Sequence, residues 1–123
     1  MDIRVSGHQV EVGDALRGHA ADALKAADDK YRMRATSAQV TFGKGPHDHG
    51  FTCEIVAYAP PGLVLKAVER AADARPAFEA ALDKVAKQMR RNARRQKDRN
   101  GAGVNDEVSG GDLEPAAERR GIG

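Results

Sequence analysis

Residues 36–58 read TSAQVTFGKGPHDHGFTCEIVAY, and this stretch decides the fold. Its two ends, residues 36–43 and 51–58, alternate polar and apolar side chains and are rich in Val, Thr, Phe, Tyr and Ile. That pattern is typical of half-buried strands. The residues between them, KGPHDHG, contain two glycines and a proline, which predict a loop. The stretch therefore predicts a β-hairpin.

The segments on either side of the hairpin predict two more strands and a helix. Residues 2–6 alternate as a half-buried strand does. Residues 63–69 predict a fourth strand after the turn Pro60-Pro61-Gly62. Residues 14–31 predict an amphipathic helix, since apolar residues recur there at helical spacing. Its apolar stripe consists of Leu16, Ala20, Ala23, Leu24, Ala27 and Tyr31.

A second, longer helix is predicted after residue 73. Asp73 can cap it, and Pro76 suits its first turn because an N–H there would have no helical partner. No helix-breaking residue follows before Gly101, so the helix can extend for about 25 residues. Its predicted buried stripe consists of Phe78, Leu82, Val85 and Met89.

The predicted order is β-α-β-β-β-α, which is an α+β fold. This mixture of helices and hairpins favours a four-stranded, mostly antiparallel sheet with both helices packed on one face. A chain of 123 residues holds one domain more readily than two, and we assign residues 1–99 to that domain. Residues 100–123 hold six of the 13 glycines and little hydrophobic periodicity, so we predict a disordered tail or linker there.

The formal net charge of +2 conceals an uneven distribution. Residues 84–99 carry eight basic residues and one acidic residue, whereas residues 100–123 carry two basic and five acidic residues. A block of one sign within a nearly neutral chain indicates a polyanionic partner more than a small metabolite.

Several of these basic residues follow one another at intervals of three or four, so they lie along one face of a helix. They are Lys84, Lys87, Arg91, Arg94 and Arg95, and Arg90, Lys97 and Arg99 widen the band. A positive stripe several turns long suits the phosphates of a nucleic-acid backbone. A solvated helix end is the alternative, because basic residues are favourable near any helix C-terminus. An acidic protein or a membrane surface is a further alternative.

Other kinds of site have little support in the sequence. Aromatic residues make up 4% of the chain and Trp is absent, which argues against a base-stacking platform. The single cysteine, Cys53, alternates within a strand and is expected to be a buried structural thiol. His47-Asp48-His49 supplies at most part of a metal site, and we expect a polar hairpin tip there. We predict no metal and no cofactor.

The sequence also excludes some classes of protein. It contains none of the phosphate-binding or hydrolase motifs with a defined mechanism, so we expect no enzyme. It has no apolar run long enough to cross a membrane and no secretory signal, so we expect a cytoplasmic protein without a membrane partner.

Several motifs resemble the ribosome hibernation promoting factor and ribosome-associated inhibitor family. The start of that family is similar to Ile3-x-x-x-Gly7, the run VEVGDALR at residues 10–17, and Tyr31. Its hairpin loop is similar to Lys44 with His47 three residues later. Its second helix is similar to Asp73 and the runs AFEAALDK and KQMRR that follow. The resemblance covers residues 1–99.

The resemblance implies a function as well as a fold similar to double-stranded RNA-binding domains. It implies binding to the decoding region of the small ribosomal subunit, on 16S rRNA and within the 70S ribosome. Translation would be inhibited in stationary phase or under stress, because the protein blocks the mRNA and tRNA sites. The implied RNA contacts are Lys84, Lys87, Arg90, Arg91, Arg94, Arg95, Lys25, Lys30, Arg32, Lys44 and His47, and Arg34 could flank the same channel.

Two other functions remain open. A generic double-stranded RNA-binding module would share the basic helix, and a protein-interaction adaptor would use the sheet and the acidic tail. Long members of the family carry a C-terminal domain that pairs ribosomes. We expect dimer formation only if such a domain is missing from this chain.

Overall fold

The computed structural model describes the backbone of residues 1–102 and the side chains of residues 1–47 and 49–95. The chain divides into two compact units, residues 1–90 and residues 91–123. The predicted tail falls on residues 100–123, and from residue 103 onward it lies outside the described residues.

The elements follow the predicted order β-α-β-β-β-α. They are β1 (Asp2–Gly7), α1 (Asp14–Tyr31), β2 (Ser37–Lys44), a short 3-10 turn (Pro46–Asp48), β3 (Phe51–Ala59), β4 (Leu63–Ala71) and α2 (Ala74–Ala102). The Asp73 carbonyl accepts the first helical hydrogen bond of α2, from the Ala77 N–H at 3.2 Å. Asp73 therefore stands at the position where the sequence predicted a cap.

The four strands form one mixed sheet in the order β1-β2-β3-β4. Strand β1 pairs with β2 in parallel, with Val5 opposite Val40, because α1 returns the chain to its starting side between them. The pairs β2–β3 and β3–β4 are antiparallel and are joined by short turns. The predicted α+β fold with a mostly antiparallel sheet is confirmed.

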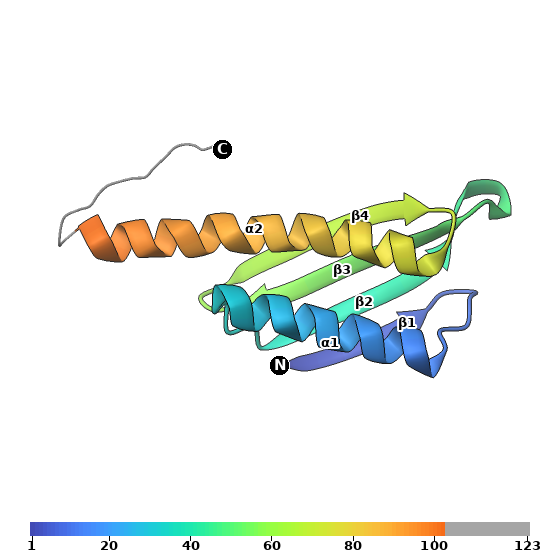
Figure 1. The fold of residues 1–123 in the computed structure, drawn as a ribbon, viewed down its shortest axis with the longest axis horizontal. Coiled ribbons are helices and arrows are strands. Elements are labelled where there is room, and N and C mark those ends of the chain that lie inside the picture. The colour runs from blue at the N-terminus through green and yellow to red at the C-terminus, as the bar shows by residue number, and fades with distance from the viewer. Residues whose placement is uncertain (103–123) are drawn as a thin grey trace. The chain divides into compact units, whose positions relative to one another are not determined.

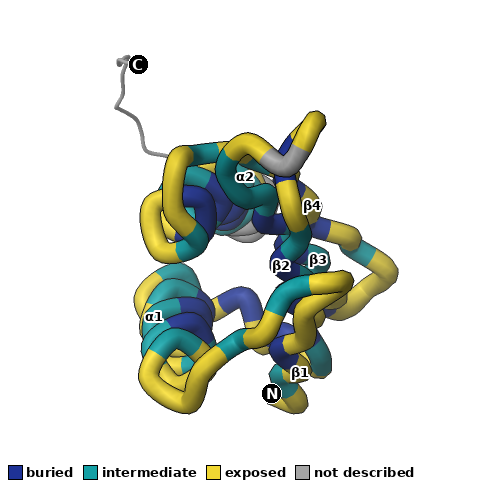
Figure 2. The backbone as a smooth tube through the Cα atoms, turned by 90° about the vertical axis from the view of Figure 1, so that its right-hand side faces the viewer, coloured by how far each residue is buried: buried dark blue, intermediate teal, exposed yellow. Residues whose placement is uncertain are grey.

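Within the first unit, both helices lie on the same face of the sheet (Figure 1, Figure 2). Figure 2 shows the buried segments of the helices turned toward the strands. The core between the two layers includes Phe42 of β2 and Phe78 of α2, both fully buried, with ring centroids 6.4 Å apart. The opposite face of the sheet has no helix over it among residues 1–90, and Tyr58, Val64 and Val68 are exposed there.

The buried stripe of α2 differs from the prediction at one position. The fully buried residues are Ala77, Phe78, Ala81, Val85 and Met89. Leu82 was predicted in this stripe, but it is only half-buried and lines a groove between α1 and α2. The neighbouring Ala81 side chain is fully buried instead.

Helix α1 buries a carboxylate that its apolar pattern does not reveal. Ala20 and Leu24 are fully buried, and Asp28 is 8% exposed. The Asp28 Oδ1 atom accepts a hydrogen bond from the Ala35 N–H at 2.9 Å, which satisfies the buried carboxylate. This contact organises the turn after α1, where Arg32 and Arg34 adopt positive φ angles of 52° and 58°.

Candidate nucleic-acid interface

Eight basic residues were predicted on the second helix, and the side chains of two of them, Lys97 and Arg99, lie outside the described residues. The other six lie in α2, and all six are exposed. They are Lys84, Lys87 and Arg90 in the first unit, and Arg91, Arg94 and Arg95 in the second. We call the first three the inner cations and the second three the outer cations. Each group supplies charge at the protein surface, where a phosphate can reach it without displacing core residues.

Two of the inner cations are held by carboxylates. The Lys84 Nζ lies 2.7 Å from the Glu69 Oε2 on β4, and the Lys87 Nζ lies 3.2 Å from the Asp83 Oδ2 one turn earlier. The hydrogen bond that Lys84 donates to Glu69 raises the pKa of Lys84, and the negative charge of Glu69 adds to the effect. Both lysine side chains remain more than half exposed, so solvent screens these pairs and a phosphate can compete for the cations.

Gln88 fixes this part of α2 against the edge strand of the sheet. Its Oε1 accepts a hydrogen bond from the Lys66 N–H at 3.1 Å, and its Nε2 donates to the Lys66 carbonyl at 2.8 Å. The side-chain amide thus satisfies both backbone groups of an edge residue. Because Gln88 lies between Lys84 and Arg90, it holds the inner cations at a fixed place beside β4.

The remaining basic residues of α2 have a different environment. Among the described side chains, Arg90 and the outer cations form no ion pair. Guanidinium groups stay charged at any physiological pH and offer several donors in a plane, which suits phosphate oxygens.

The basic residues predicted near α1 are also exposed. Lys25 lies within α1, and the Lys30 Nζ is 5.3 Å from the centroid of the Tyr31 ring. Lys30 and Tyr31 line the groove between α1 and α2 together with Asp83, the partner of Lys87. The structure therefore brings Lys30 near the inner cations, whereas Arg32 belongs to the turn that ends α1.

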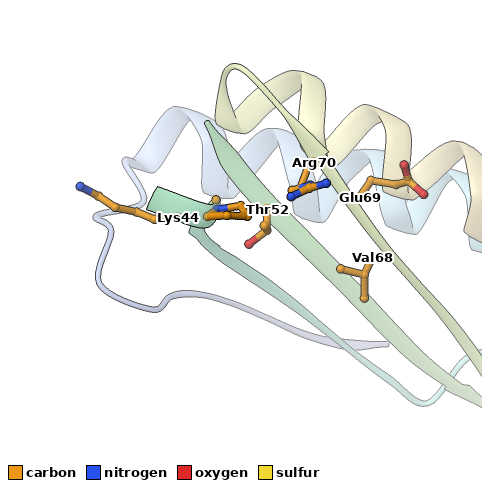
Figure 3. Close-up of a pocket in the computed structure, with 7 residues that line it drawn as sticks. Lys44, Thr52, Val68, Glu69 and Arg70 are labelled. Atoms are coloured by element: carbon orange, nitrogen blue, oxygen red, sulfur yellow. The ribbon is translucent and has the colours of Figure 1, made fainter. Parts of the chain in front are cut away.

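The candidate residues of the β2–β3 hairpin lie at the C-terminal end of β2. Lys44 is the last residue of β2 and His47 lies in the short turn that follows, and both are exposed. Gly50 closes the loop with a φ of +74°, and a Cβ there would lie 2.6 Å from the Ala71 carbonyl oxygen. Only glycine therefore lets the loop approach the end of β4 this closely. Lys44 and Arg70 of β4 line one pocket beside the loop (Figure 3).

A polar cluster at the start of α2 was missed in the sequence. The His19 Nε2 lies 2.6 Å from the Glu79 Oε2, and Arg75 approaches the His19 Nδ1 at 3.3 Å. The His19 ring also meets Phe78 edge-on, with centroids 5.6 Å apart. These contacts join α1 to α2 across 60 residues of sequence, so they fix the position of one helix against the other.

The described residues offer little for catalysis. Cys53 is fully buried in β3, as predicted, and burial raises the pKa of its thiol to about 12. A thiol with such a pKa is a poor nucleophile at neutral pH. Within the described side chains, no three His, Cys, Asp or Glu residues gather closely enough to hold a metal ion. None of the helices within residues 1–102 is long and apolar enough to cross a lipid bilayer.

Sequence comparison relates the chain to proteins of the ribosome. Residues 3–97 match the family model described as sigma 54 modulation protein / S30EA ribosomal protein. The chain is 35% identical over 106 residues to a ribosome hibernation promotion factor of Rhizobium meliloti (strain 1021), covering 85% of this chain and 55% of that protein. It is 33% identical over 99 residues to the factor of the same name from Bradyrhizobium diazoefficiens, covering 80% of this chain and 48% of that protein. The chain thus spans about half the length of these curated relatives.

Structure comparison gives the same relationship at the level of the fold. The Protein Y N-terminal domain of Thermus thermophilus superposes with a TM-score of 0.65 and 25% sequence identity, covering 75% of this chain and 99% of that domain. A ribosomal subunit interface protein from Coxiella burnetii also superposes with a TM-score of 0.65, at 16% identity, covering 75% and 97% of the two chains. The second likeness concerns the fold alone.

Proposed function

The chain belongs to the sigma 54 modulation protein / S30EA ribosomal protein family, and on this premise we propose that it is a ribosome hibernation factor. In this proposal it binds the decoding region of the small ribosomal subunit, on 16S rRNA and within the 70S ribosome. It inhibits translation there in stationary phase or under stress. A site of action on the ribosome makes the cytoplasm its location.

One observation carries the proposal beyond family membership. Between residues 84 and 95, α2 exposes six basic residues, namely Lys84, Lys87, Arg90, Arg91, Arg94 and Arg95. The only acidic residues paired with them among the described side chains are Glu69 and Asp83. Such a stretch can neutralise successive RNA phosphates and release their counterions. Lys25, Lys30, Arg32, Lys44 and His47 supply further exposed donors for the same RNA.

The proposed mechanism is occlusion. Two helices on a sheet, tied together by buried side chains, form a rigid body that can fill a channel in the ribosome. Its basic residues contact rRNA, and its bulk blocks the sites of mRNA and tRNA. This mechanism needs no bond making or breaking, in keeping with the proposal that the protein is not an enzyme.

A generic double-stranded RNA-binding module is the second candidate. Two helices on one face of a mostly antiparallel sheet, with cations on a helix, favour comparison with double-stranded RNA-binding domains. Such domains recognise duplex shape rather than one site on a particle. The two candidates therefore differ in whether a free duplex competes with the ribosome.

Sedimentation through sucrose gradients distinguishes them. The protein is mixed with purified small ribosomal subunits, with large subunits, or with free RNA duplex. We expect co-sedimentation with small subunits that a large excess of duplex does not abolish. Equal binding to free duplex and to small subunits would favour the generic module, and binding to neither would exclude both.

A further inference from the structure

Arg70 lies on the face of the sheet that carries no helix. Its neighbour Glu69 contacts Lys84 of α2, so Glu69 points to the helix side and the side chain of Arg70 to the open side. In the antiparallel register, Arg70 is directly opposite Thr52, and Thr52 is directly opposite Gly43. These three residues form one row across β4, β3 and β2 on the open face.

Neither of the two carboxylates closest to Arg70 in the register is directed to it. Glu69 is held by Lys84 at 2.7 Å, and Figure 3 shows its carboxylate turned away from Thr52 and Arg70. Glu54, diagonally across from Arg70 on β3, pairs with Lys66 at 3.5 Å. Among the described side chains, Arg70 forms no ion pair. Its guanidinium is therefore available to an anion.

The surface around Arg70 is hollow and polar. A pocket there is lined by Lys44, Gly45, Pro46, Thr52, Val68, Glu69 and Arg70. Figure 3 shows Lys44 extending away from Thr52 and Arg70, so Arg70 is the cation that lines this part of the pocket with Thr52. A Cβ at Gly43 would lie 2.9 Å from the Thr52 Oγ1. Because glycine has no Cβ, no side chain at position 43 crowds the Thr52 hydroxyl.

We propose that Arg70 and Thr52 form a phosphate-binding site for the RNA backbone on the open face of the sheet. A guanidinium and a hydroxyl that line the same pocket offer charge and several donors to phosphate oxygens. This inference rests on the proposed function, because it assigns a second RNA contact to a ribosome-binding protein. Lys84 lies on the helix side of β4 and Arg70 on the other, so the two residues contact RNA from opposite faces of the sheet.

The test compares Arg70→Gln with Arg4→Gln in binding to purified small ribosomal subunits, measured over a series of KCl concentrations. Arg4 is a matched control, because it is an exposed arginine on the same open face but on the opposite edge strand. We expect Arg70→Gln to weaken binding and to lower the slope of log affinity against log salt by about 0.7–0.9, the value for one phosphate contact. Arg4→Gln should match the unaltered chain. Thr52→Val should weaken binding without lowering the slope, since it removes a hydroxyl and no charge.

The outcomes separate this inference from the function on which it rests. If the unaltered chain binds small subunits and Arg70→Gln behaves as Arg4→Gln does, the Arg70 site is wrong and the proposed function stands. If the unaltered chain does not bind, both are wrong.

Titration with inorganic phosphate, followed by the amide resonances of Thr52 and Arg70, identifies the source of the phosphate. Saturation at micromolar phosphate would overturn the assignment to RNA, because it indicates a site for the free ion.

Discussion

Residues 74–90 and residues 91–95 of α2 are both rich in cations, yet they differ in what else they do. The first stretch buries five side chains completely, Ala77, Phe78, Ala81, Val85 and Met89, whereas the second buries none to that extent. We therefore expect the first stretch to support folding as well as binding. In the second stretch the three arginines are exposed, so we expect them to contribute to binding more than to folding.

The charges of the two stretches differ in the same way. Lys84 and Lys87 are paired with Glu69 and Asp83, whereas the outer cations form no ion pair among the described side chains. A paired cation must give up its carboxylate partner when it binds a phosphate, whereas an unpaired cation gains the phosphate without losing a partner. The comparison leads us to expect that substitutions change stability in the first stretch and RNA affinity in both.

The largest effect on stability is expected from Phe78→Ala. This ring is fully buried against Phe42 and His19, so its removal should lower the free energy of unfolding by about 3–5 kcal/mol. Urea denaturation followed by circular dichroism measures the loss. Leu82→Ala is the matched control, and its half-buried side chain should cost distinctly less. Equal losses for the two variants would contradict the packing of this helix.

A large effect on binding without an effect on stability is expected from neutralising the outer cations. The triple variant Arg91→Gln, Arg94→Gln and Arg95→Gln removes three exposed charges. Its midpoint in urea should match that of the unaltered chain, while its affinity for small subunits at low salt should fall sharply. A lowered midpoint would show that this stretch also supports the fold.

A smaller effect, in the opposite direction, is expected from Glu69→Gln. It removes the carboxylate that competes for Lys84, so the affinity for small subunits should rise. Glu54→Gln is the matched control, because Glu54 pairs with Lys66 rather than with an inner cation. Weaker binding by Glu69→Gln would mean that Glu69 positions Lys84 for RNA instead of competing with RNA.

The same pair predicts a pH dependence. Glu69 raises the pKa of Lys84 above its ordinary value of 10.5, so the contribution of this lysine to stability is complete below 10.5. It is lost only as the pH rises through the raised value. The stability difference between the unaltered chain and Glu69→Gln should therefore stay constant from about pH 7 to about pH 9. A difference that disappears within this range would contradict the bridge.

The smallest effect is expected on the reactivity of the Cys53 thiol, which measures how well the core is shielded from solvent. With its pKa raised to about 12 by burial, the thiol should react with iodoacetamide at pH 8 far more slowly than in urea. The triple variant of the outer cations should keep this protection, whereas Phe78→Ala should reduce it. Rapid labelling of the unaltered chain would show that β3 opens readily.

The order of elements could be predicted because each segment has a clear period. The alternation in residues 36–43 and 51–58 predicted two strands to within one residue, and the helical period after Gly13 predicted α1 with its end near Tyr31, as observed. Leu82 was placed incorrectly because a helical period cannot decide between two adjacent apolar positions. Which of the two positions, 81 or 82, is fully buried depends on where the sheet and α1 lie around the helix.

The candidate site could be predicted only in part, for a related reason. Consecutive basic residues on a helix are visible in the sequence, and so are Lys44 and His47 in a loop. The partners of those residues are not, because Glu69 reaches Lys84, and Gln88 reaches Lys66, only through the placement of α2 beside β4. Arg70 was missed for the same reason. Its row with Thr52 exists only in the strand register.

The salt dependence of binding to the small ribosomal subunit tests the central claim most directly. The claim is that cations of α2 bind rRNA through its phosphates. The measurement compares the unaltered chain with the triple variant Lys84→Gln, Lys87→Gln and Arg91→Gln, whose neutral side chains bring no repulsion toward Glu69. We predict that the slope of log affinity against log salt falls by about two to three units and that inhibition of translation in a cell-free system is lost. An unchanged slope and undiminished inhibition by the folded variant would contradict the claim.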